Sequence, residues 1–64
     1  MDATGATELI VREIRERISL VEEAIFSGIP YDEYRALCGE RKGLLLALGY
    51  TKDLKNKLES DDDD

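Results

Sequence analysis

The sequence predicts an all-α fold: an antiparallel hairpin of two helices that self-associates, most simply as a dimer forming a four-helix bundle. Three observations predict it. Apolar residues recur at spacings of 3, 4, 3 and 4 at Val11, Ile14, Ile18, Val21 and Ile25, which is a heptad pattern. The breaker Ser27-Gly28-Ile29-Pro30 follows it. Beyond the breaker, residues 44–49 read Leu-Leu-Leu-Ala-Leu-Gly, and six consecutive apolar positions surround a helix completely, so they need cover on every side.

The first helix is expected over residues 7–27, after a flexible leader at residues 1–6. Thr7 is a suitable N-cap, and Glu8 then falls in the first turn, where the helix dipole favours a negative charge. Charged residues fill the surface around the heptad positions. Glu8 with Arg12 and Glu13 with Arg17 have the spacing of stabilising i, i+4 pairs.

A turn is expected at residues 28–30, followed by a second helix over residues 31–59. Gly28 can adopt the left-handed conformation that ends many helices, and Pro30 keeps Ile29 out of the helical region. Asp32 and Glu33 then lie near the positive end of the second helix. Because the connection is so short, the two helices must be antiparallel neighbours.

The second helix carries two faces of apolar or small residues, one with large side chains and one with Gly39, Gly43 and Ala47. One face should take the first helix and the other a second chain, although the sequence leaves open which takes which. The glycines favour close helix packing, with a flexible point as the alternative. Arg41 either extends its charge into solvent or forms a salt bridge to Glu13, Glu22 or Glu40. The predicted helix and oligomer interface comprises Leu37, Gly39, Gly43, Leu44, Leu45, Ala47 and Leu48.

Nothing in the sequence indicates an enzyme. There is no histidine and only one cysteine, so no catalytic residues, zinc site of the usual kind or cofactor is expected. Cys38 is interpreted as a small buried hydrophobe, with a reactive thiol as the alternative. The carboxylates fall on polar faces beside basic residues, which predicts solvated charges, not an acid–base pair. The aromatic residues lack interleaved Lys or Arg and are expected to be core residues.

The net charge of −6 is concentrated at the end of the chain. Asp61, Asp62, Asp63 and Asp64 leave only −2 for residues 1–60, a balance that argues against direct nucleic-acid binding. The acidic tail, residues 60–64, is a solubilising segment or a site that docks on a basic partner. With no signal-peptide features and no apolar run long enough to span a bilayer, the expected location is the cytoplasm, without membrane association.

A short pattern in the second half resembles small helical proteins of tailed bacteriophages whose role is unknown. It comprises Tyr31-Asp32-Glu33-Tyr34, then Leu37-Cys38-Gly39, Gly43-Leu44 and Ala47, and finally Lys52-Asp53-Leu54 before the acidic end. The resemblance covers residues 31–64 and transfers no functional residue. It implies an accessory assembly or interaction protein with an unidentified protein partner, in the host cytoplasm or associated with the virion. The alternative is a small acidic inhibitor that binds a basic site on a host protein through the tail.

Overall fold

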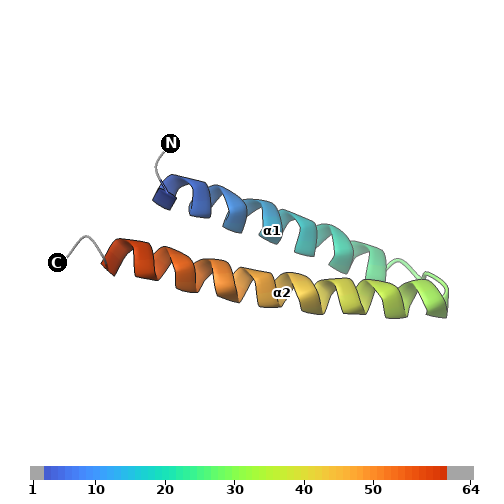
Figure 1. The fold of residues 1–64 in the computed structure, drawn as a ribbon. Coiled ribbons are helices and arrows are strands. Elements are labelled where there is room, and N and C mark those ends of the chain that lie inside the picture. Colours follow the sequence, from blue (N-terminus) through green and yellow to red (C-terminus); the bar gives the residue numbers. More distant parts are fainter. Residues whose placement is uncertain (1–2, 61–64) are drawn as a thin grey trace.

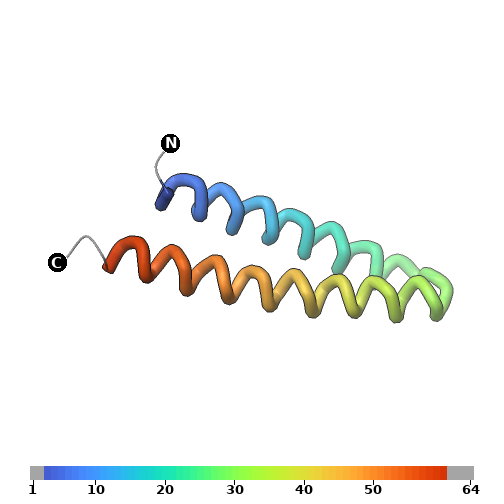
Figure 2. The backbone as a smooth tube through the Cα atoms, viewed as in Figure 1, coloured from blue at the N-terminus to red at the C-terminus, as the bar shows by residue number. Residues whose placement is uncertain are grey.

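The chain forms an all-α helical hairpin, as the sequence predicts. A computed structural model describes residues 3–60, which form helix α1 (Ala3–Ile25) and helix α2 (Tyr31–Ser60). The helices run antiparallel and pack along their length, so that Ala3 and Ser60 lie at the end opposite the turn (Figure 1). The backbone trace shows that the first turns of α2 project beyond the end of α1 (Figure 2).

Helix α1 begins four residues earlier than predicted, and Thr7 is not its N-cap. The Thr7 side-chain hydroxyl donates a hydrogen bond of 2.8 Å to the Thr4 carbonyl, and the residue is only 4% exposed. Thr7 thus occupies an interior helical position, one turn from the start, and Glu8 lies beyond the first turn. Residues 3–6 belong to the helix, not to a leader, because extending α1 lets Thr7 be buried.

The turn follows the prediction closely. Helix α1 ends at Ile25, two residues before the predicted boundary, and Gly28 adopts a φ of 84°, a left-handed conformation that glycine tolerates without strain. The Pro30 carbonyl accepts a 2.9 Å hydrogen bond from the Tyr34 amide, which starts α2 at Tyr31. Helix α2 then continues to Ser60, one residue past the predicted end.

The described part of the chain has a very small core, and α1 supplies all of it. Its buried residues are Ile18, Val21 and Thr7, whereas none of the 30 residues of α2 is buried. The hairpin is a single layer of two helices, with a radius of gyration of 15.1 Å, against about 11 Å for a compact domain of this length. Most apolar side chains of α2 therefore stay in contact with solvent.

Candidate interaction surface

The face of α2 that packs on α1 carries large apolar side chains. Leu37, Leu44 and Leu48, all from the predicted interface, share one side of the helix and are half-buried. Within residues 3–60, α1 is the only element that packs on α2. This side of α2 is therefore the face that takes the first helix. Leu45, from the same predicted set, is 41% exposed and lies at the edge of the contact.

Three ion pairs between described residues of α1 and α2 favour one alignment of the two helices. The Arg17 guanidinium contacts Glu40 Oε1 at 2.8 Å, Arg41 Nε lies 3.4 Å from Glu22 Oε2, and Lys55 Nζ lies 3.3 Å from Glu8 Oε1. Arg41 thus forms a salt bridge to Glu22, one of the predicted partners. All three pairs are partly exposed, so each contributes little stability but favours this register. Glu8 and Arg17, which were expected to pair along the first helix, thus pair across the two helices.

A second apolar surface on α2 has no partner in the hairpin. We call it the outer stripe; its residues lie within about 80° of arc, roughly 130° around the helix from Leu37, Leu44 and Leu48. Every member is exposed, including Leu46 at 55%, Tyr50 at 72% and Leu54 at 50%. The outer stripe consists of Asp32, Ala36, Gly39, Gly43, Leu46, Tyr50, Leu54 and Lys57.

The outer stripe includes residues from the predicted interface and others that sequence reasoning missed. Gly39 and Gly43 belong to it, whereas Ala47 is half-buried at its border with the α1 contact. A Cβ atom added at Gly39 or Gly43 would meet nothing within 4 Å, so α1 does not use the close approach that these glycines permit. The sequence did not single out Leu46, because every residue of the run 44–49 is apolar or small. Leu46 nevertheless follows Gly43 by three residues and precedes Tyr50 by four, a spacing that places it on the outer stripe.

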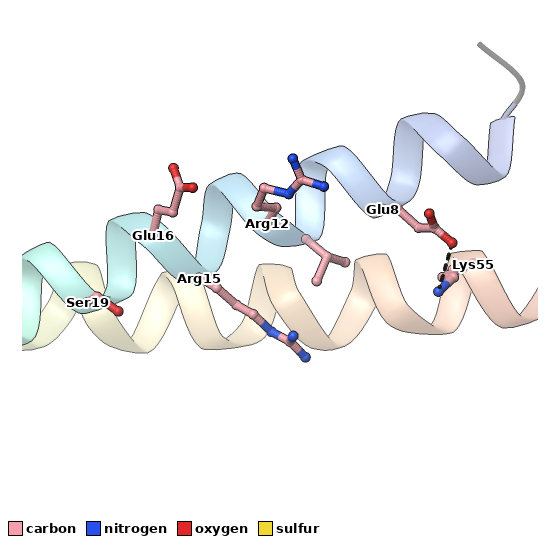
Figure 3. A pocket seen from close by; sticks show the side chains of 7 residues that line it. Glu8, Arg12, Arg15, Glu16, Ser19 and Lys55 are labelled. Atoms are coloured by element: carbon pink, nitrogen blue, oxygen red, sulfur yellow. Dashed lines mark ion pairs between the residues drawn. The ribbon is translucent and has the colours of Figure 1, made fainter.

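A shallow groove of about 450 Å³ runs between the helices on another side (Figure 3). Both acidic and basic side chains line this groove. In the view of Figure 3, the Glu8–Lys55 pair lies at one end, Arg15 points toward the α2 side and Glu16 points away from it. Arg12 and Ser19 complete the polar lining. Among the described residues, no buried side-chain nitrogen or oxygen lacks a hydrogen bond.

The aromatic residues are not core residues, contrary to the prediction. Phe26 is 85% exposed and Tyr31 70%, and Tyr34 stacks on Tyr31 with ring centroids 6.5 Å apart. They lie near the turn, where α2 projects beyond α1, and all three rings are exposed. Tyr34 lies beside the half-buried Cys38. A hydrogen bond to the Cys38 side chain, together with the electrostatic interaction between the two side chains, raises the pKa of Tyr34 above its ordinary value.

Residues 3–60 hold no cluster of three or more side chains of the types that ligate metals. Over the same residues, neither helix is both long and apolar enough to cross a bilayer. The predicted docking tail, Asp61–Asp64, lies outside the described residues. No protein-family model, curated protein or solved structure matches the chain.

Proposed function

We propose that this chain is a non-enzymatic interaction protein that acts as an oligomer of helical hairpins. The observation that carries the proposal is the outer stripe of α2, where Leu46, Tyr50 and Leu54 are at least half exposed. Contiguous apolar surface of this kind marks protein–protein contact sites in small proteins. On α1, Ile10 and Leu20 are further exposed apolar side chains.

The chain exposes more surface than a compact protein of its mass. The chain exposes 4941 Å², whereas a compact monomer of 7.2 kDa exposes about 4100 Å². This larger area agrees with the elongated shape of a two-helix hairpin. Within residues 3–60, only two apolar residues, Ile18 and Val21, are buried. Such a core is small for a domain of this length, and small domains often gain the missing burial by oligomerisation.

The proposed role is that of an accessory assembly component, of the kind found among small proteins of tailed bacteriophages. Its support is the resemblance of residues 31–64 together with a surface suited to packing against another helix. It would act in the host cytoplasm or on the virion, and its further protein partner is unidentified.

Sedimentation equilibrium of the full chain over a range of concentrations tests this proposal. We expect a reversible association to a dimer, or to a larger species, at tens of micromolar. Tyr50→Glu, which places a charge in the outer stripe, should shift the protein to monomer while far-UV circular dichroism stays helical. The matched control is Tyr31→Glu, because Tyr31 is equally exposed but lies off the stripe. A folded wild-type monomer at these concentrations would overturn the proposal.

A further inference from the structure

We infer that the outer stripe of α2 binds the outer stripe of a second copy of this chain, with the two α2 helices antiparallel. The inference rests on the proposed function and adds the partner, the contact face and the register. The two halves of the stripe differ in character. From Asp32 to Gly43 the side chains are acidic, small or absent, and from Leu46 to Lys57 they are large or basic.

An antiparallel two-fold axis between residues 44 and 45 places each half on the other. Asp32 then lies opposite Lys57 of the partner subunit, and Ala36 opposite the partner's Leu54. Gly39 lies opposite the partner's Tyr50, and Gly43 opposite the partner's Leu46. All four pairs form in the same register. The sum of the two residue numbers differs by no more than one between the pairs, as a single two-fold axis requires.

The pairs are complementary in size and in charge. An open space above Gly39 and Gly43, where an added Cβ would meet nothing within 4 Å, can receive the two most exposed large side chains of the stripe, Tyr50 and Leu46. Glycines also allow two helix axes to approach at the short end of the usual 8–10 Å range. At the ends, an acidic residue from the first turn meets a lysine from the last turn.

A parallel arrangement, by contrast, has like residues facing each other. Gly43 would face glycine, leaving a gap, and Tyr50 would collide with the partner's Tyr50. Asp32 and Lys57 would each face a residue of the same charge, which is destabilising. An unrelated helix is not expected to complement the stripe in size and charge at all four positions. The self-complementary pattern therefore points to a second copy.

Charge reversal tests the register. Asp32→Lys and Lys57→Asp should each weaken dimerisation by about tenfold or more, because each creates two repulsive pairs per dimer. The double variant, which restores opposite charges, should return the dissociation constant to within about threefold of wild type. Glu33→Lys and Lys52→Asp are controls that reverse neighbouring charges off the stripe. Glu33 shares the first turn with Asp32, so its variant reports the helix-dipole cost alone.

A spin-label distance tests the orientation in the same dimer. Asn56 is exposed and lies off the stripe, so a label at Asn56→Cys in a Cys38→Ser chain should not disturb the contact. Antiparallel pairing places the two Asn56 positions about 35 Å apart along the helix axis, whereas parallel pairing keeps them within about 20 Å.

The outcomes separate this inference from the proposed function. A dimer with a label distance near 35 Å and rescue by the double charge reversal supports both. A dimer with a short distance, or without rescue, overturns the antiparallel stripe contact and leaves the proposed function standing. A chain that stays monomeric overturns both.

Discussion

Replacing Gly43 with leucine is expected to stabilise the single hairpin and to weaken its self-association. Gly43 and Gly49 both lie inside α2, and a Cβ added at either would meet nothing within 4 Å. Leucine is favoured over glycine in a helix interior by about 0.8 kcal/mol, because it has less backbone freedom to lose. Either substitution should therefore raise the equilibrium constant for folding of the monomer by about fourfold.

Only Gly43 lies on the outer stripe, so the two variants should differ in the dimer. A leucine at Gly43 would meet the partner's Leu46 where the helices approach most closely. Overpacking of this kind costs about 1–3 kcal/mol, and symmetry places the clash in the dimer twice. We expect the dimer dissociation constant to rise at least tenfold for Gly43→Leu and to stay unchanged for Gly49→Leu.

Two measurements on the same samples separate these effects. Sedimentation equilibrium gives the dissociation constant, and thermal unfolding followed by circular dichroism, at concentrations below it, gives monomer stability. A gain in monomer stability in both variants shows that the leucines are accommodated in the helix. If Gly43→Leu then dimerises as tightly as Gly49→Leu, the stripe is not the contact and the reasoning is refuted.

Three further predictions concern the hairpin itself. Val21→Ala should lower the free energy of unfolding by about 2 kcal/mol in chemical denaturation, because Val21 is only 2% exposed and its cavity cannot refill from a thin core. The partly exposed Arg17–Glu40 pair should contribute less than about 1 kcal/mol, measured by a double-mutant cycle, and less still in high salt. The raised pKa of Tyr34 favours the neutral phenol in the folded chain, so its contribution to stability is present below pH about 10 and is lost as pH rises through the folded pKa. A phenolate absorbance titration should show Tyr34 ionising late, and Cys38→Ala should bring it back toward the ordinary value; no change on removing the thiol would contradict the assigned cause.

The hairpin could be predicted from the sequence because two local signals agree. The heptad positions from Val11 to Ile25 fix the buried side of α1, and Gly28 with Pro30 fixes the turn. The start of α1 could not be placed the same way. Thr7 has the chemistry of an N-cap, but it also fits an interior position where its hydroxyl bonds to the preceding turn. The burial of Thr7 distinguishes the interior position from the N-cap position. Burial depends on tertiary packing, which the local sequence does not show.

The candidate surface was predictable in kind but not in position. Apolar residues surround α2 at 44–49, so periodicity alone could not assign one side to α1. The structure assigns Leu37, Leu44 and Leu48 to that contact and leaves Leu46 outside. The aromatic residues were predicted to be core residues because they are apolar. Those near the turn lie beyond the end of α1, where the core of the hairpin stops.

The outer stripe costs the lone hairpin stability in two ways. Gly39 and Gly43 each weaken the helix interior by about 1 kcal/mol relative to alanine, and α1 makes no use of the space they leave. Leu46 and Tyr50 expose apolar surface to water, which gains nothing in a monomer. Antiparallel contact with a second copy reverses both costs at once, because the large side chains fill the space above the glycines. A helix facing only solvent needs neither feature, and so the two together favour self-association over a hairpin that acts alone.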